Sequence, residues 1–503
     1  MTPRRIVVVG AGGSGIPLAA RLAQHGHEVV LLEAGPAGAA SGDAAAAHGL
    51  EHAWTVSEGL PDGALTWTYD AELFAGRPWR IARGRLLGGS TSVNGAYFQR
   101  PHPDDFAGWA AVAGAEWSYD ACLPALRRLE NDRDFGDDTV HGAEGPVPVA
   151  RAGASDRVTQ TFLAAAVEAG ALPEPDKNGG GPSGAGLLPR NAVGPARWGV
   201  ARAYAGLLAA GSVETHAGVV VERIVFRGDA TIGVDVTRAG ETSFLAADEV
   251  ILSAGAIETP RLLQRSGIGD ASALSADTKL VAERPGVGRG LSDHAALDIA
   301  WEPRPGVVSP ELDAAWTAAW NVPAGQVADA AIELLLAAKP TAAILSGRAA
   351  AVGPLDLRIT LATPRSRGTV TAGMIRYGYL GRPEDLAALR AATRLAAAVL
   401  RSGPMRQVVA SAAVPAWADA PASEEAAEDW IRGALGTALH SCGTARMGDA
   451  DDPDAVTDAH GRVHGATGLR VADASLLPAV PSRGTALTAV LVGERIAELI
   501  ASE

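Results

Sequence analysis

The chain has 503 residues, 47% of them hydrophobic and 20% charged, which is typical of a globular protein large enough for two domains. Its net charge of −14 disfavours a nucleic-acid partner, because no basic stripe interrupts the acidic composition. Two cysteines, Cys122 and Cys442, are too few for a disulfide framework, so we expect a reducing, cytoplasmic location.

Residues 6–33 predict a strand, a glycine turn, a helix and a second strand. The turn consists of Gly10, Gly12, Gly13, Ser14 and Gly15. Its first glycine permits a tight bend, the second lets backbone N–H groups approach a pyrophosphate, and the last lets the helix pack on the strand. Glu33 ends the second strand, where a carboxylate binds a ribose 2′-OH and repels the 2′-phosphate of NADP. The pattern predicts a site for NAD or FAD; the alternative is a βαβ unit that binds nothing.

The start of the chain superficially resembles a signal peptide, because Arg4 and Arg5 precede an apolar run. We reject that interpretation, since the run is the first strand of the dinucleotide unit and lacks a fitting cleavage site. No apolar stretch of about 18 residues predicts a transmembrane helix, and peripheral contact with a membrane stays open.

Further elements follow in chain order after a polar excursion over residues 36–77. A Gly- and Pro-rich segment over 171–199 predicts a long surface loop. The remaining predicted elements are a hairpin over 219–226 and 231–237, a buried strand over 249–253, and helices over 384–402, 424–436 and 487–500.

Four further motifs resemble the diagnostic sequences of the glucose–methanol–choline (GMC) family of FAD oxidoreductases. They are Arg83-Gly-Arg-Leu-Leu-Gly88-Gly89-Ser90-Thr91-Ser-Val93-Asn94-Gly95, residues 255–269, residues 288–294, and residues 440–448 continued by 469–475. Together with residues 6–33 they span the chain. The resemblance therefore implies that the dinucleotide is FAD.

The resemblance also implies the fold class. We expect an α/β protein in which a Rossmann-type FAD-binding domain is interleaved with an antiparallel-sheet substrate domain. The FAD-binding domain would take residues 1–100, 215–295 and 437–503. The substrate domain would take residues 101–214 and 296–436.

Matching positions assign contacts with the cofactor. The segment from Gly88 to Thr91 would let the backbone pass close to the flavin and offer hydroxyl groups to the diphosphate. Asn94 matches a donor to the flavin carbonyls, Val221 a contact of the adenine, and Asp473 the acid near the ribityl–diphosphate region. The resemblance assigns further contacts to Ala34, Arg83, Gly95, Ala254, Gly255, Ala474 and Thr485.

His440 is the residue for which the resemblance implies chemistry, because it opens the motif that places a base beside the flavin. Its imidazole would take the hydroxyl proton of an alcohol while hydride leaves the carbon for flavin N5. Asp293 and His294 match a pair that we interpret as holding the fold. We interpret Cys442 as a small buried side chain rather than a redox group.

One position departs from the family pattern. Most members carry a second His or Asn that bonds the substrate oxygen, but the corresponding residue here is Gly484. The neighbouring polar residues Ser482, Arg483 and Thr485 are candidates to replace it. We single out Arg483, whose guanidinium would stabilise the negative charge that arrives with hydride. The alternative is a surface arginine on a loop.

These motifs predict an enzyme that oxidises an alcohol-type CH–OH group, most simply a dehydrogenase. The run from Asn94 to Phe106 and the departure at Gly484 resemble a branch associated with mycofactocin, a peptide-derived redox cofactor. In that version reduced mycofactocin is the donor and the respiratory chain is the electron acceptor. The alternatives are an alcohol oxidase that makes hydrogen peroxide, a hydroxynitrile-lyase-like enzyme and a non-catalytic flavoprotein.

Val93 generates the first testable prediction. Some family members carry at this position a histidine that bonds covalently to the flavin, and valine has no nucleophile. We therefore predict non-covalent FAD, which acid precipitation should release as a yellow supernatant. Colour that stays with the unfolded pellet would contradict the prediction.

Overall fold

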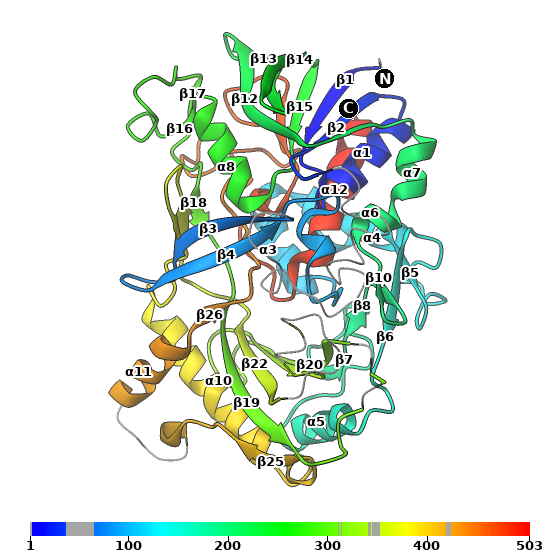
Figure 1. The fold of residues 1–503 in the computed structure, drawn as a ribbon, viewed down its shortest axis with the longest axis vertical. Helices are drawn as coiled ribbons and strands as arrows, with labels where there is room; N and C mark the ends of the chain where they lie inside the picture. The colour runs from blue at the N-terminus through cyan, green and yellow to red at the C-terminus, as the bar shows by residue number, and fades with distance from the viewer. Residues whose placement is uncertain are drawn as a thin grey trace.

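The computed structural model describes residues 3–36, 65–309, 311–312, 314–340, 344, 353–418 and 424–503. Five strands form a parallel sheet in the order β11-β2-β1-β15-β27, in the upper half of Figure 1. They are β1 (Arg5–Val9), β2 (Glu28–Glu33), β11 (Glu214–Ala217), β15 (Glu249–Leu252) and β27 (Leu469–Val471). Three distant stretches of the chain thus build one sheet, which confirms the interleaved Rossmann-type fold.

The first and last helices, α1 (Gly15–Gln24) and α12 (Thr485–Ala501), pack side by side against this sheet. The Ser14 hydroxyl donates to the Ala489 carbonyl at 2.7 Å, and the Arg21 guanidinium donates to the buried Glu494 carboxylate at 2.9 Å. Arg128 of α4 (Tyr119–Leu129) donates to the same carboxylate at 2.9 Å. These contacts hold the first half of α12 beside α1 and the glycine turn. The helix predicted over 487–500 is confirmed.

A second, antiparallel sheet occupies the lower half of Figure 1, with the order β25-β19-β22-β21-β20-β7 and β26 paired to β19. Its strands are β7 (Ala185–Leu187), β19 (Ala295–Pro303), β20 (Trp316–Val322), β21 (Ile332–Ala337), β22 (Leu355–Leu361), β25 (Val409–Ala412) and β26 (Gly436–Thr437).

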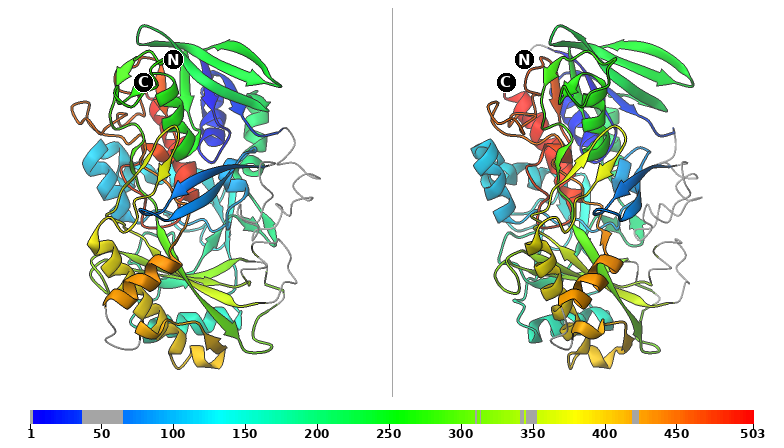
Figure 2. Two further views of the ribbon diagram at one scale, coloured as in Figure 1. Left: turned by 60° about the vertical axis from the view of Figure 1, so that its left-hand side comes forward. Right: turned by 90° about the vertical axis from the view of Figure 1, so that its left-hand side faces the viewer.

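The two faces of this sheet differ because side chains alternate along a strand. On β19, Leu297 and Ile299 enter a core shared with the helices, whereas Asp298 faces the other way. The covering helices are α5 (Arg157–Glu168), α10 (Pro383–Arg401) and α11 (Glu424–Ala434); Figure 2 shows the last two in yellow and orange. The inner face is left to line a cavity between the sheets.

The predicted hairpin is present as β12 (Val219–Arg227) and β13 (Ala230–Arg238), extended by β14 (Glu241–Ala246). A further hairpin of β3 (Thr66–Glu72) and β4 (Pro78–Gly84) lies between the two large sheets (Figure 1). The remaining helices and strands are α3 (Pro103–Ala113), α6 (Val200–Ala203), α7 (Ala205–Ala210), α8 (Gly255–Arg265), β5 (Glu130–Asp132), β6 (Val147–Arg151), β8 (Pro189–Arg190), β9 (Ala192–Val193), β10 (Ala196–Arg197), β16 (Ile268–Gly269), β17 (Ala282–Glu283), β18 (Arg289–Leu291), β23 (Gly368–Val370) and β24 (Ile375–Arg376).

The segment 171–199 is not the surface loop that its glycines and prolines predict. It contributes β7 to the second sheet and buries Lys177, Asn178 and Asn191. Its turns pack because buried polar partners satisfy their backbone: the Gly184 N–H, for example, donates to the Glu174 carboxylate at 2.9 Å. Most of the excursion predicted over 36–77 lies outside the described residues.

Within the part of the chain that the structure describes, no helix combines the length and the apolar character needed to cross a bilayer.

A buried ion-pair network fixes one edge of this segment. The His141 ring nitrogens lie 2.8 Å from carboxylate oxygens of Glu130 and Asp176. Arg100 pairs with Glu130 at 2.5 Å, and Arg151 pairs with Asp176 at 3.1 Å. Burial lowers the pKa of His141, but the hydrogen bonds to the two carboxylates outweigh it and raise that pKa to about 9.

The raised pKa of His141 predicts a pH-dependent stability. Its contribution should be complete below pH 6.5, the unfolded-state value, and should disappear as the pH rises to about 9. The difference in free energy of unfolding between the parent and His141→Gln should therefore shrink over that interval. Denaturant titration measures it, with the more exposed His216→Gln as the control. A difference that is constant with pH would contradict the prediction.

Candidate active site

A cavity of about 890 Å³ extends from the ends of β1 and β2 to the inner face of the second sheet. The β3–β4 hairpin, residues 89–97, the start of α8 and residues 436–441 complete its walls. Its volume lies in the upper part of the range for ligand sites.

The end of the cavity at the parallel sheet is shaped by the glycine turn. Gly10 has φ +100°, and a Cβ there would lie 2.6 Å from the Ser253 carbonyl oxygen. A Cβ on Gly12, in contrast, would meet no atom within 4 Å. The N-terminus of α1 therefore faces the cavity over bare backbone, the arrangement that suits a pyrophosphate.

Glu33 lies at the end of β2 and lines the same part of the cavity. Its carboxylate accepts from the Ala11 N–H at 3.1 Å and from the Gly35 N–H at 2.8 Å. Burial, the largest influence, raises the pKa of Glu33 to about 7. The position and the fixed orientation suit a ribose hydroxyl pair.

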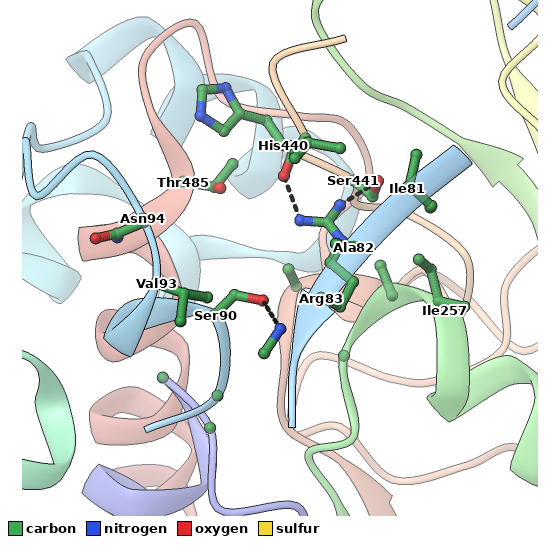
Figure 3. Close-up of a pocket in the computed structure, with 18 of the residues that line it drawn as sticks. Ile81, Ala82, Arg83, Ser90, Val93, Asn94, Ile257, His440, Ser441 and Thr485 are labelled. Atoms are coloured by element: carbon green, nitrogen blue, oxygen red, sulfur yellow. Dashed lines mark hydrogen bonds between the residues drawn. The ribbon is translucent and has the colours of Figure 1, made fainter. Parts of the chain in front are cut away.

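The segment 88–95 bends through Gly88 and Gly89, whose φ values are +89° and +52°. The Ser90 hydroxyl accepts from the Gly84 N–H at 3.2 Å, which leaves its own proton to donate (Figure 3). The Thr91 hydroxyl donates to the Gly88 carbonyl at 2.6 Å. Thr91 therefore supports the turn while it lines the cavity, and its contact with a diphosphate stays a prediction.

Asn94 and Asp473 make different use of their side chains. The Asn94 Oδ1 accepts from the Ala96 N–H at 3.0 Å, which leaves its amide N–H groups to donate into the cavity. One Asp473 oxygen accepts from the Gly255 N–H at 2.8 Å and from the Thr259 hydroxyl at 2.6 Å. Asp473 thus holds the turn into α8 beside the cavity.

Nearly all residues predicted to contact the cofactor line this one cavity. Two do not: Gly15 and Gly88. A Cβ on Gly15 would overlap the Gly10 carbonyl, and one on Gly88 would overlap the Ser92 hydroxyl. Both glycines therefore let the backbone pack rather than face a ligand. The donor set and the bare helix terminus fit FAD.

His440 enters the cavity from the opposite wall, and its peptide is held on both sides. The His440 N–H donates to Asp293 at 3.1 Å, and Arg83 donates to the Leu439 carbonyl at 2.6 Å and to the Ser441 hydroxyl at 2.8 Å (Figure 3). Asp293 also accepts from the Ser441 hydroxyl at 2.6 Å. These bonds fix the direction in which the imidazole points.

The imidazole of His440 is bonded at both nitrogens. Its Nδ1 lies 2.9 Å from Nδ1 of His294, and its Nε2 lies 3.2 Å from the hydroxyl of Tyr97. Burial is the main reason that the pKa of His440 lies well below 6.5, and the neighbouring His294, Arg83 and Arg358 lower it further. His440 is therefore neutral at physiological pH and able to accept a proton.

The pair Asp293 and His294 thus does more than hold the fold, because both residues contact His440 directly. Burial lowers the pKa of His294 to about 4, so this imidazole is neutral as well. Cys442 is a fully buried free thiol, as its interpretation as a small packed side chain requires.

Arg483 does not enter the cavity, which corrects our expectation. Its guanidinium is buried, pairs with Glu174 at 2.6 Å and donates to the Lys177 carbonyl. A buried cation takes the direction in which it finds a carboxylate, and Glu174 lies behind the cavity wall. The expected electrostatic role beside a flavin therefore does not follow from this placement.

The sequence did not point to the side chains on the inner face of the second sheet. Trp316 lies under the Arg358 guanidinium, 5.2 Å from the ring centroid, and Arg358 pairs with Asp298 at 2.9 Å. Burial is the main reason that the pKa of Asp356 on the same wall is raised to about 6. The sequence shows that polar and apolar side chains alternate along these strands. It does not show that the polar side chains face a ligand cavity.

A chain with a Rossmann-type sheet, a bare glycine turn and a neutral histidine in the wall of one cavity has the construction of a flavin-dependent oxidoreductase. Comparison with known proteins agrees. Residues 9–296 and 360–493 match the N- and C-terminal sequence profiles of the GMC oxidoreductases.

The chain is 34% identical to an uncharacterised GMC-type oxidoreductase of Rhodococcus erythropolis, over 98% of this chain and 97% of the other. It is 33% identical to 5-(hydroxymethyl)furfural oxidase of Methylovorus sp., over 99% and 98% of the two chains. Among solved structures, pyridoxine 4-oxidase from Mesorbium loti superposes with a TM-score of 0.88 at 26% identity, over 99% of both chains. The chain belongs to the GMC family and is an FAD oxidoreductase that acts on alcohol-type substrates.

Glu33 generates a prediction about FAD binding. At pH 8, above its pKa of about 7, Glu33 is mainly ionised, so Glu33→Gln removes the charge and one acceptor; a hydrogen bond to a charged group contributes about 1.5–3 kcal/mol. FAD should therefore bind about 10–100-fold more weakly, as measured by titrating the flavin-free protein. Glu28→Gln, at the exposed start of the same strand, is the control. Equal affinity of Glu33→Gln and the parent would contradict the assignment.

Proposed function

We propose that the chain oxidises a hydroxymethyl group to the aldehyde, with His440 as the general base. The observation that carries the proposal is the neutral Nε2 of His440, which faces the cavity. Its position is held because the His440 N–H donates to Asp293 and the Arg83 guanidinium donates to the Leu439 carbonyl. A base with a pKa below neutrality is available for proton transfer at every physiological pH. Bound FAD supplies the hydride acceptor.

The two ring nitrogens of His440 would have different roles in proton transfer. A proton on Nδ1 donates to Nδ1 of His294, whose pKa of about 4 keeps that ring neutral and able to accept. This tautomer leaves the lone pair of Nε2 for the substrate O–H proton. Arg83 and Asp293 hold the backbone of residues 439–441, so the ring keeps its orientation when the proton arrives.

Aromatic and heteroaromatic hydroxymethyl compounds are the substrate class that we favour. Two of the similar proteins are named for 5-(hydroxymethyl)furfural and for pyridoxine, which both carry a hydroxymethyl group on a heteroaromatic ring. The inner face of the second sheet offers Trp316 and Leu335 to a ring and the Asp298–Arg358 pair to its polar substituents. Reduced mycofactocin stays a prediction and belongs in the same panel of donors.

The electron acceptor separates two versions of this function. The sequence leads us to expect a dehydrogenase that delivers electrons to a respiratory acceptor. The names of two similar proteins favour an oxidase, which would make hydrogen peroxide. Measuring peroxide during aerobic turnover, against reduction of an artificial acceptor under argon, distinguishes the two.

His440→Ala tests the base. Loss of a general base typically costs about 10²–10⁴-fold in rate, so flavin reduction by the alcohol should slow by that factor in anaerobic stopped-flow experiments. FAD content should be retained, because the glycine turn and Glu33 are unchanged. The exposed His25→Ala is the control. Reduction of His440→Ala at the parental rate would exclude His440 as the base.

The depressed pKa of His440 predicts the pH profile of the same reaction. Protonation at low pH removes the base, so the rate falls as the pH drops through that pKa. Since the pKa lies well below 6.5, the rate of flavin reduction should be constant between about pH 6.5 and 8. A rate that rises steadily over that interval would show that another group controls proton transfer.

A further inference from the structure

The Tyr97 ring fills the part of the cavity that a side chain at position 484 would occupy. A Cβ on Gly484 would lie 2.8 Å from Cζ and 2.9 Å from the hydroxyl oxygen of Tyr97. These distances are shorter than side chains tolerate, so the Tyr97 ring occupies the volume into which any side chain at 484 would project. Both residues line the cavity with His440.

The backbone around Tyr97 is fixed from both sides. Ala96 adopts φ +56°, and the next residue, Phe98, donates its N–H to the Pro189 carbonyl at 2.7 Å. Tyr97 itself forms a β-bridge with Arg190. The ring then stands edge-on to the His440 imidazole, with centroids 6.3 Å apart and an interplanar angle of 79°.

The Tyr97 hydroxyl lies 3.2 Å from Nε2 of His440, the nitrogen that faces the substrate. A substrate hydroxyl that bonds to this nitrogen replaces the phenol as its partner, and the phenol is then adjacent and free to donate to the substrate oxygen. Burial keeps the pKa of Tyr97 well above 10, so the phenol stays protonated and acts as a donor.

We infer that Tyr97 is a second catalytic residue, whose hydroxyl donates a hydrogen bond to the substrate oxygen while His440 removes the proton from that oxygen. The inference rests on the proposed alcohol oxidation. Before substrate binds, the phenol donates to Nε2 of His440; when the alcohol arrives, the phenol transfers this hydrogen bond to the alcohol oxygen and leaves Nε2 free.

The proton and electron balance of the step is simple. The substrate O–H bond breaks and its proton forms a bond to Nε2 of His440, while the C–H bond breaks and its electron pair leaves as hydride to the bound flavin. The O–H bond of Tyr97 stays intact throughout. Its donor stabilises the negative charge that develops on the oxygen as the carbonyl forms, where one well-placed donor typically contributes about 10²–10³-fold in rate.

Tyr97→Phe tests this role, because phenylalanine keeps the ring beside Gly484 and removes only the hydroxyl. The limiting rate of anaerobic flavin reduction at saturating alcohol should fall about 10²-fold, whereas FAD content, thermal unfolding and reduction by dithionite should match the parent. Tyr119→Phe is the control, because the Tyr119 hydroxyl is buried without a hydrogen-bond partner and lies outside the cavity lining. It should leave the rate unchanged.

A rescue experiment distinguishes donation from packing. Tyr97→Ala empties the volume next to position 484, and adding Gly484→Asn places an amide donor there. The double variant should reduce its flavin at least about tenfold faster than Tyr97→Ala alone.

Three results would overturn the inference in different ways. A parental rate for Tyr97→Phe would show that the ring only packs. A double variant no faster than Tyr97→Ala would show that a donor at this place does not assist the reaction. If no hydroxymethyl donor reduces the flavin of the parent enzyme, the proposed function fails and the role of Tyr97 fails with it.

Discussion

The hydrogen bonds that hold the chain at His440 are the constraint on which the rest of the site depends. Asp293 accepts from the His440 N–H and the Ser441 hydroxyl, and Arg83 donates to the same stretch from β4. The two large sheets alone leave a cavity open to many ligands. Because the backbone at residues 439–441 is fixed, the neutral imidazole of His440 is held at one position in the cavity wall. This position determines where a proton can be removed from a substrate.

A second constraint is the small space at the same wall. Gly484 begins the turn into α12, and the absence of a side chain there admits the Tyr97 ring from the segment that follows the flavin motif. Arg483 turns the opposite way and pairs with the buried Glu174. These two adjacent residues therefore have different roles. Gly484 leaves space in the cavity for the Tyr97 ring, and Arg483 anchors the segment 171–199 behind the cavity wall.

Local features of the fold could be predicted from the sequence, because short-range geometry fixes them. The glycine turn, the acid at the end of β2 and the helix over 487–500 each follow from spacing within a few turns of chain. The segment 171–199 misled the prediction, because buried partners hold its turns, as the Glu174 carboxylate holds the Gly184 N–H. Composition alone does not distinguish such turns from a surface loop.

The second half of the site could not be predicted, because it depends on contacts between distant residues. Tyr97 and His440 lie 343 positions apart, and Arg483 and Glu174 lie 309 positions apart. The motif placed His440 in the site, but no local pattern indicates which ring fills the place beside Gly484. The sequence offered one signal, which was a glycine at position 484, where the family pattern has a side chain. That glycine indicated free space at this position but did not indicate that Tyr97 fills it.

The central claim is that hydride leaves a carbinol carbon held between His440 and the flavin. The most direct test is anaerobic reduction of the bound flavin by a hydroxymethyl compound with deuterium in place of both carbinol hydrogens. Our account predicts reduction that is several-fold slower than with the unlabelled compound, with one deuterium passed to the flavin or the solvent and the other kept on the aldehyde carbon. Reduction at the same rate, or an aldehyde that has lost both deuterium atoms, would contradict it.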